Sequence, residues 1–526
     1  MYDSDQTSGA FPLEVPLEHS PNPISTGCVD LSAIATTVHD PSEYSETPDQ
    51  LCDVCCNIDL AKCFSALCFD CKPHRYHLGK VEDIRSRKGC ALCRMISAVH
   101  NSAGCNILDV SSEQCTLVNS RSGDEIKVYF TTGGSWDIEN RSVIHVIRQC
   151  IGDWMIEDWM NKGLRIKSLS APTGWKKARR IGGRRIEPRQ VDFGLIRNWL
   201  HVCETSHGDK CNRSGLISKT AGKIRLIDVL SHQIINGITN GRYLALSYVW
   251  GLGQQFCLHS QNEGNLRMLH GLKIDSMPRM VRDAINLVAK IGERYLWIDR
   301  LCILMDGERD KLEQMSNMDQ IYNSATLTII NGDACCSNAP IAGVEPETRR
   351  SIQHSEVIRG VCCITTQSEL IPEILLTNWS TRGWTYQEGF LSSRCLVFTD
   401  YQAYFQYKSD VWCEDSWSTG SRDMDRKSTI GNALCHLPDR DINVSRCSFY
   451  QCIDAIEAFS RRRLSVETDT LWAFTGITDT FQPQFPAGFT WGLPAETLDA
   501  ALLFGILQGI LMVREDAYMS RLSTLI

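Results

Sequence analysis

Long apolar segments are missing from this chain of 526 residues. The longest apolar stretch, Ala500–Val513, covers about 14 residues and contains Gln508, whereas a helix that crosses a bilayer needs roughly 20 apolar residues. The first residues, MYDSDQTSGAFPLEV, also lack the basic start and the apolar centre of a secretory signal peptide. We therefore expect a cytoplasmic protein with no membrane span.

Familiar catalytic motifs are missing as well. The sequence contains no Gly-x-Ser-x-Gly, His-Glu-x-x-His or Walker motif. The net charge of −8, from 62 acidic and 54 basic residues, gives no general attraction to nucleic acid or anionic membranes. The basic segment Lys176–Arg185 has no interleaved aromatic residues and is most simply a solvated linker, with nuclear targeting or RNA contact as the alternative. A nucleic-acid partner is therefore not expected.

Cysteine, by contrast, is abundant, with 25 residues. In a chain without a signal peptide, reduced thiols or metal ligands are expected rather than disulfides. Near the N-terminus, Cys52-x2-Cys55 and Cys90-x2-Cys93 form two pairs separated by 34 residues. Zinc prefers four soft ligands in a tetrahedron, and each pair supplies two of them from one tight turn. These four cysteines are therefore candidate ligands of a structural zinc ion.

Other interpretations of these cysteines stay open. His74 and His77 lie between the two pairs and could compete with them as zinc ligands. The cysteines could also be buried free thiols, or could take part in redox chemistry.

The organisation of the chain follows from its composition. Residues 1–48 are rich in Ser, Thr, Pro, Asp and Glu and have no sustained apolar period, which is typical of disorder. We divide the chain into a disordered tail (1–48), a Cys-rich module (49–160), a basic linker (161–190), an α/β domain (191–410) and a mostly helical C-terminal extension (411–526).

Strand and helix patterns alternate from residue 241 onward. The predicted elements are strands at 243–249, 295–298 and 326–330, helices at 277–291 and 310–325, and then a helix at 383–391 and strands at 395–399 and 403–407. In helix 310–325 the periodicity places Leu312, Met315 and Met318 on the inward face. The βαβαβ order predicts an α/β fold with a parallel sheet and right-handed crossovers.

Three Trp-rich segments indicate one composite site. They are YLALSYVWG (243–251), RYLWIDRLCI (294–303) and TRGWTYQE (381–388). The first two end apolar runs with polar residues, and ligands of open α/β sheets bind at strand ends. The candidate ligand-binding residues are Ser247, Tyr248, Trp250, Gly251, Asp299, Arg382 and Trp384, with Glu388 as the candidate catalytic residue.

The chemistry of this site has alternatives. On a helix, Trp384 and Glu388 share one face, so they could stack a planar ring and stabilise an oxocarbenium-like charge on a sugar. Equally, Trp384 could be a core residue with Glu388 buried against Arg382. Asp299 could form a structural ion pair with Arg300, and the glycines after Trp250 could form a simple turn.

The same segments resemble the fungal heterokaryon incompatibility (HET) domain family. The matching motifs are LSYVWG (246–251), YLWIDRLCI (295–303), MDQIYNSA (318–325) and WSTRGWTYQE (379–388). Two features depart from the family pattern. Leu304-Met305-Asp306 replaces the usual Gln-Asp pair, and the late Pro-Ser-Trp-Ser-Trp segment is missing.

The resemblance implies a flavodoxin/TIR-like fold and a role in non-self recognition and regulated cell death. Protein partners are then expected, either an incompatibility partner or a second copy of the chain. HET domains are distantly similar to TIR domains, some of which cleave NAD. This analogy implies an alternative function as an NAD hydrolase, with Glu388 as its catalytic residue and NAD as its substrate.

Overall fold

The computed structural model describes residues 50–59, 63, 74–102, 113–119, 125–132, 143–148, 181–206, 211, 224–237, 241–251, 256–350, 353–359, 361–367, 370–375, 377–407, 410–418, 448–499 and 501. The predicted tail 1–48 lies outside this range, as does nearly all of Ala500–Val513. None of the described helices has both the length and the apolar character that crossing a bilayer requires.

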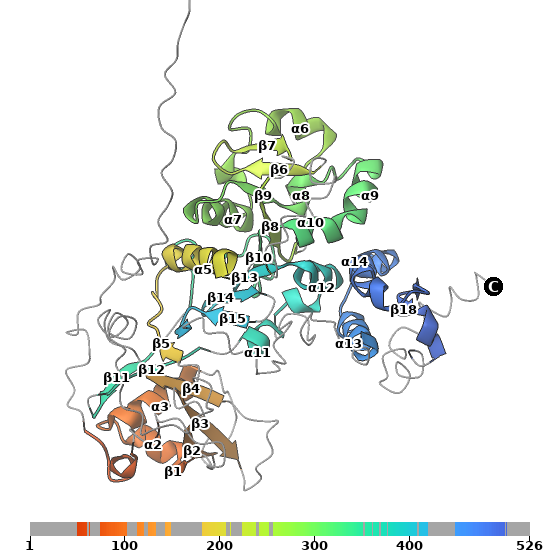
Figure 1. The fold of residues 1–526 in the computed structure, drawn as a ribbon. Helices are drawn as coiled ribbons and strands as arrows, with labels where there is room; N and C mark the ends of the chain where they lie inside the picture. Colours follow the sequence, from red (N-terminus) through yellow and green to blue (C-terminus); the bar gives the residue numbers. More distant parts are fainter. Residues whose placement is uncertain are drawn as a thin grey trace, which may run out of the picture. The chain divides into compact units, whose positions relative to one another are not determined.

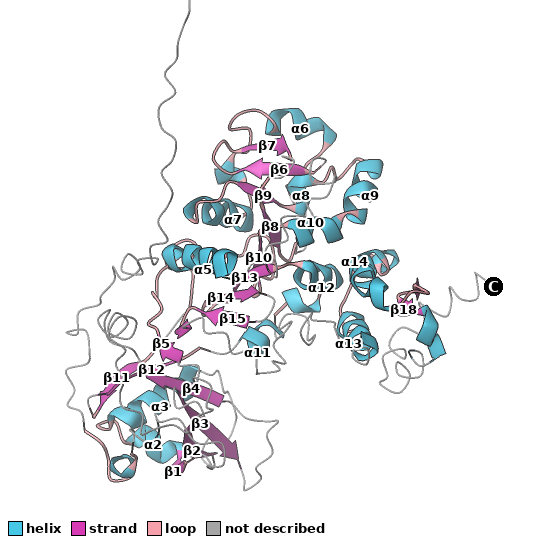
Figure 2. Cartoon of the chain, in the orientation of Figure 1, coloured by secondary structure: helices cyan, strands magenta, loops and turns pink. Residues whose placement is uncertain are grey.

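A mixed eight-stranded sheet forms the centre of the α/β domain (Figure 2). Its strand order is β15-β14-β13-β10-β8-β9-β6-β7. The strands are β6 (Arg225–Asp228), β7 (Gln233–Asn236), β8 (Leu244–Ser247), β9 (Tyr295–Trp297), β10 (Leu327–Asn331), β13 (Arg394–Phe398), β14 (Ala403–Tyr407) and β15 (Asp410–Cys413). The four inner strands β13, β10, β8 and β9 are parallel, whereas the strands at both edges are antiparallel. The prediction of a parallel sheet therefore holds for the inner strands only.

Helices cover both faces of this sheet. In Figure 1, α5 and α7 lie on one side of the strands, and α10 and α12 lie on the other. The helices are α5 (Phe193–Ser206), α6 (Ser260–Leu266), α7 (Arg279–Lys290), α8 (Asp299–Cys302), α9 (Glu308–Ser316), α10 (Met318–Ser324), α11 (Leu370–Leu375) and α12 (Gly383–Leu391). Numbered along the chain, the parallel strands stand in the order 2-1-3-4, so the order reverses between β8 and β10. Such a reversal is the switch point at which open α/β sheets bind ligands.

One predicted helix is in fact two. Residues 310–325 were expected to form a single helix, but α9 ends at Ser316 and α10 begins at Met318. Asn317 leaves the helical conformation at φ −107° and ψ 6°, and its side chain donates to the carbonyl of Glu313. The break changes which residues of α9 face inward, so the inward position predicted for Leu312 is wrong, and its side chain is 53% exposed.

A second sheet belongs to the Cys-rich module and contains a hairpin from much later in the chain. Its order is β1-β2-β3-β4-β12-β11. The strands are β1 (Arg75–Lys80), β2 (Glu113–Asn119), β3 (Glu125–Thr132), β4 (Val143–Arg148), β11 (Ser355–Ile358) and β12 (Val361–Thr365), and they pack with helices α2 (Val81–Ser86) and α3 (Ala91–Ser102). Ile358 and Cys363 of the hairpin are buried in the core of this module.

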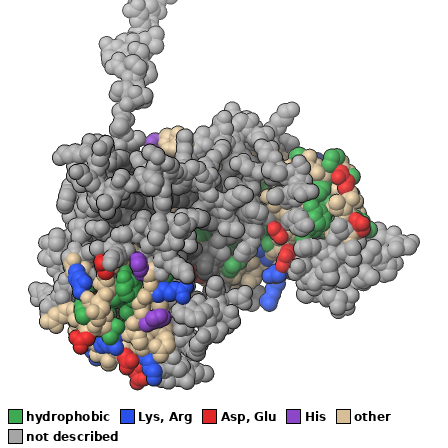
Figure 3. All heavy atoms as spheres, turned by 60° about the horizontal axis from the view of Figure 1, so that its bottom comes forward, with side chains coloured by type: hydrophobic (Ala, Val, Ile, Leu, Met, Phe, Trp, Pro, Cys, Tyr) green, Lys and Arg blue, Asp and Glu red, His purple; other side chains and the backbone are tan. Residues whose placement is uncertain are grey.

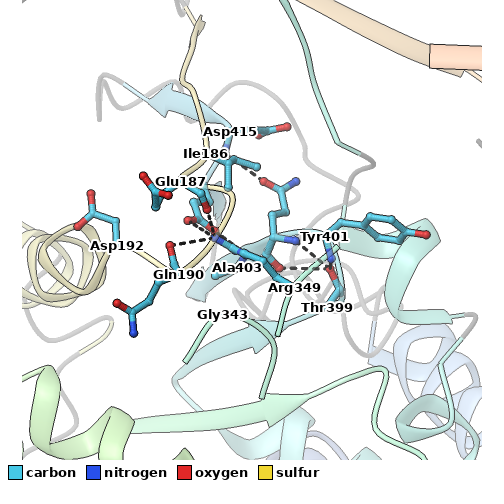
Figure 4. Close-up of polar contacts among 12 residues, drawn as sticks. Ile186, Glu187, Gln190, Asp192, Gly343, Arg349, Thr399, Tyr401, Ala403 and Asp415 are labelled. Carbon is cyan, nitrogen blue, oxygen red and sulfur yellow. Dashed lines mark hydrogen bonds and ion pairs between the residues drawn. The ribbon is translucent and has the colours of Figure 1, made fainter. Parts of the chain in front are cut away.

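Arg349 joins the segment before the α/β domain to the segment after it through buried polar contacts (Figure 4). Both Arg349 and Glu414 have fully buried side chains, and their closest N···O distance is 2.6 Å. Arg349 also donates to the carbonyl oxygen of Glu187 at 3.0 Å. Beside this pair, β5 (Ile181–Gly183) forms a two-stranded sheet with β16 (Ser416–Ser418). The last residues of the segment predicted as a basic linker thus pack against the domain, and residues 161–180 lie outside the described range.

The C-terminal described residues pack on the α/β domain. Their elements are α13 (Ser448–Ser460), α14 (Trp472–Phe481), the short helices Glu467–Asp469, Gln482–Gln484 and Ala495–Thr497, and the strands β17 (Phe489–Thr490) and β18 (Leu493–Pro494). Helix α14 lies against α12, where the backbone N–H of Gly476 donates to the Gln387 side chain at 3.0 Å. The buried side chains of Phe474 and Ile477 join the main core.

Candidate functional site

Ser247, the last residue of β8, lies at the centre of a buried polar cluster. Its hydroxyl oxygen accepts a hydrogen bond from the indole N–H of Trp379 at 2.7 Å and donates one to the Glu388 carboxylate on α12. Ser247 is fully buried and Glu388 is only 6% exposed. Desolvation by burial therefore raises the pKa of Glu388 to about 7. A carboxyl group that titrates near neutral pH suits proton transfer, or a change of charge state inside the fold.

A second polar group follows β8 and β9 at the same end of the sheet. The indole N–H of Trp250 donates to the Asp299 carboxylate at 2.7 Å, and the backbone N–H of Arg300 donates to the other oxygen, also at 2.7 Å. The Arg300 guanidinium lies 3.9 Å from the Trp250 ring centroid and donates to Cys257 Sγ at 3.0 Å. Burial raises the pKa of Asp299. The Arg300 side chain stacks on Trp250, whereas the sequence leaves an ion pair with Asp299 open as one alternative.

Arg382 links the helix α12 to this second group. One of its guanidinium nitrogens donates to the carbonyl oxygen of Tyr248 at 2.7 Å, and the guanidinium lies 5.7 Å from the Trp250 ring centroid. Tyr248 is itself buried, and desolvation raises the pKa of its hydroxyl well above the usual range. The residue before α12 is thereby tied to the loop after β8.

The loops that follow β8 and β10 meet at the switch point. Gly251 has φ +77°, and a Cβ atom there would lie 2.5 Å from the Cβ atom of Cys336. The backbone N–H of Ser337 donates to the carbonyl oxygen of Trp250 at 3.3 Å. Glycine is needed here both for the left-handed backbone and for the close approach. These contacts occupy the place where an open α/β sheet would usually hold its ligand. Residues 252–255, which include the second glycine after Trp250, Gly253, lie outside the described range.

Trp384 lines a cavity to which Glu388 does not contribute. Trp384 is partly buried and lines a cavity of 220 Å³ at the start of α12, and Glu388 is absent from its lining. The other lining residues are Thr381, Arg382, Gly383, Arg463, Leu464 and Ser465. The structure thus brings Ser247 together with Glu388, and Trp250 with Asp299, but places Trp384 elsewhere.

Sequence reasoning missed two members of the buried cluster. Trp379 supplies the indole that holds Ser247, and Tyr322 on α10 donates to the carbonyl oxygen of Leu246 at 3.2 Å. Burial raises the pKa of Tyr322 well above the usual range. Trp379 belongs to the motif WSTRGWTYQE and Tyr322 to the motif MDQIYNSA. The sequence therefore marked both residues as part of the family pattern. Only the fold showed that their side chains point at β8.

The four cysteines of the two N-terminal pairs lie together. The sulfur atoms of Cys52, Cys55, Cys90 and Cys93 are all within 4.8 Å of one another, and no other described residue joins the group. Cys93 Sγ lies 3.8 Å from Cys52 Sγ and 3.6 Å from Cys55 Sγ. Four thiolates bound to zinc at ~2.3 Å in a tetrahedron lie about 3.8 Å from one another. The cluster therefore fits a metal ion, whereas His77, an alternative ligand, contacts Thr116 instead.

The charge balance of the cluster also suits a cation. Hydrogen bonds from the Cys55 thiol and its neighbours lower the pKa of Cys93 to about 6, and the positive charge of Arg87 contributes to this lowering. Sharing that hydrogen bond raises the pKa of Cys55. Metal ligation requires thiolates, so a bound cation would replace the protons that the sulfurs share.

The sheet order and the strand-end cluster define an α/β domain with a polar, Trp-rich site at its switch point. Residues 243–388 match the family model for the heterokaryon incompatibility protein (HET), so this range is similar to a HET domain. The match ends at Glu388 and so contains the whole cluster. No curated protein and no solved structure matches the chain.

Proposed function

We propose that this protein is a cytoplasmic effector of heterokaryon incompatibility that triggers regulated cell death by association with a protein partner or a second copy. The observation that carries the proposal is the closed switch point. Ser247 and Glu388 are buried against each other, and the Trp250 and Ser337 loops meet above the sheet. Because Ser247 and Glu388 are buried, we expect the domain to act through its surface.

An exposed apolar patch offers such a surface. Leu230, Met268 and Leu269 are 61%, 64% and 66% exposed, and the hydrogen bond from His270 N–H to the Ser231 carbonyl brings their two segments together. The patch adjoins β7, the last strand of the sheet order. Exposed apolar groups beside a sheet edge are typical of protein interaction sites.

The test compares two leucines that are both exposed. Leu269→Asp places a charge in the patch, whereas Leu312→Asp places one on α9, on a side chain that is 53% exposed. In yeast that expresses the chain, we expect Leu269→Asp to lower cell death. Light scattering of the purified chain should show weaker association for the same variant, and Leu312→Asp should leave both unchanged. Equal effects of the two variants would contradict the proposal.

A second candidate function is NAD cleavage by a TIR-like mechanism. It is supported by the buried carboxyl of Glu388, whose pKa of about 7 suits an acid–base or charge-stabilising group. Cellular NAD and viability should be followed together in yeast with wild type, Glu388→Gln and the exposed control Glu467→Gln. Loss of NAD in wild type and Glu467→Gln, but not in Glu388→Gln, would establish the enzyme, whereas death at constant NAD would remove it.

A nucleic-acid-associated regulator is the third hypothesis, and the surface gives it little support. Binding to nucleic acid requires a continuous basic surface. In the view of Figure 3, acidic and basic side chains lie side by side on the described surface. We therefore place protein partners ahead of nucleic acid.

We also propose that Cys52, Cys55, Cys90 and Cys93 bind one structural zinc ion. The support is the close approach of the four sulfur atoms, with Cys52 and Cys55 before and at the start of the short helix Cys55–Asn57, and Cys90 and Cys93 at the start of α3. Metal analysis of the purified chain should give one zinc per chain, and Cys55→Ser should lose it. The site would be refuted if the purified chain contains no metal and a chelator does not change its stability.

A further inference from the structure

The contacts that directly follow each cysteine pair reach the same hairpin. After Cys55, the carbonyl oxygens of Cys56 and Ile58 accept hydrogen bonds from the Arg359 guanidinium, at 3.3 Å for Ile58. After Cys93, Arg94 forms a two-point ion pair with Glu356, with both N···O distances at 2.8 Å. Glu356 lies in β11, and Arg359 lies in the turn between β11 and β12.

This hairpin is part of the HET segment, because residues 355–365 fall inside the matched range 243–388. Its side chain Ile358 is fully buried in the same core as Cys55 and Ile58. At its far end, Thr365 exchanges hydrogen bonds with His354. The hairpin therefore belongs to the HET segment by sequence and to the Cys-rich module by packing.

From this juxtaposition we infer that the metal ion acts as a clasp that holds the HET segment to the Cys-rich module. The inference rests on the proposed zinc site. The turn of Cys52 and Cys55 and the helix start of Cys90 and Cys93 come from separate parts of the chain. A tetrahedral ion fixes the distance between them, and with it the spacing of the two contacts to the hairpin. Without the ion, the distance between the two segments is held only by weaker contacts, such as the hydrogen bond from the Ala91 N–H to the Gln50 carbonyl oxygen and the shared core packing.

Hydrogen–deuterium exchange of the full chain tests the clasp. Zinc removal with a chelator should speed exchange in residues 355–365 by about tenfold or more, as expected when charge-assisted hydrogen bonds are lost. Peptides from β13 and β14 in the central sheet should not change. If zinc is bound but its removal leaves the hairpin unchanged, the clasp is refuted while the zinc site stands.

A contact variant covers the case in which zinc removal unfolds the whole module. The double variant Arg94→Ala/Arg359→Ala keeps all four cysteines, so it should retain one zinc per chain and still show fast exchange in residues 355–365. Arg461→Ala, which removes an exposed arginine directly after α13, is the matched control and should behave as wild type. Slow exchange in the double variant would refute the clasp, and a wild-type chain that binds no zinc would refute both the zinc site and the clasp.

Discussion

The charge state of Glu388 makes the stability of the fold depend on pH. Its pKa is raised by burial from 4.5 to about 7 in the folded state. Between these values the folded protein binds more protons than the unfolded chain, so the free energy of unfolding falls as the pH rises and levels off above pH 7. At about 1.4 kcal/mol per pKa unit, the full loss is about 3 kcal/mol. Glu388→Gln is neutral throughout and lacks this loss.

Urea unfolding followed by tryptophan fluorescence at pH 5, 6, 7 and 8 measures the effect. The stability of Glu388→Gln relative to wild type should increase by about 2.5 kcal/mol across this range, because a small part of the loss has already occurred at pH 5. Comparison with wild type cancels the titration of other carboxyl groups. A difference that stays constant with pH would refute the reasoning, because it would mean that folding does not raise the pKa of Glu388.

Ser247→Ala provides an independent check on the same group. The Ser247 hydroxyl donates to the Glu388 carboxylate and thereby lowers the pKa of Glu388, so its removal raises that pKa. The substitution also leaves the Trp379 N–H without its acceptor. The variant should lose about 1–3 kcal/mol, and its loss of stability with pH should extend to a higher pH than in wild type.

Two further substitutions test contacts that shape the domain. Arg349→Met should lower the free energy of unfolding by about 3–5 kcal/mol, because it leaves the buried Glu414 carboxylate without its cation. In urea unfolding, the double variant Arg349→Met/Glu414→Met should recover most of that loss. A double variant as unstable as the single one would contradict this. Gly251→Ala should lower the free energy of unfolding by about 1–3 kcal/mol, because the backbone there is left-handed and the added methyl group would meet Cys336. The loss should be seen as a lower melting temperature. An unchanged melting temperature would show that the two loops can move apart.

The inner part of the fold could be predicted because its signals are local. Helix α7 buries Met280, Val281, Ala284 and Leu287 as its 3.6-residue period indicates, and the alternation of strands and helices predicted the parallel strands. The pairing of β12 with β4, and of β5 with β16, joins segments that are far apart in sequence. Neither the apolar period nor the turn residues of these strands specify such distant partners.

The candidate site shows the same limit. The Trp-rich motifs marked Ser247 and Glu388 as members of one site, and their side chains do meet. The sequence could not show that the site is closed, because closure depends on Trp379 and on the contact between Gly251 and Cys336. A Trp beside a carboxylate is compatible with both a ligand site and a packed core.

The late hairpin has a consequence for synthesis of the chain on the ribosome. Strand β4 ends at Arg148, and the strand that pairs with it, β12, follows β11, which begins at Ser355. At roughly 5–20 residues per second, the nascent chain needs on the order of 10–40 s to reach that point. During this time the edge of β4 has no partner strand, and such edges readily pair with other chains. The Cys-rich module is therefore translated before residues 243–388 and can be completed only after much of that HET-like range has been made.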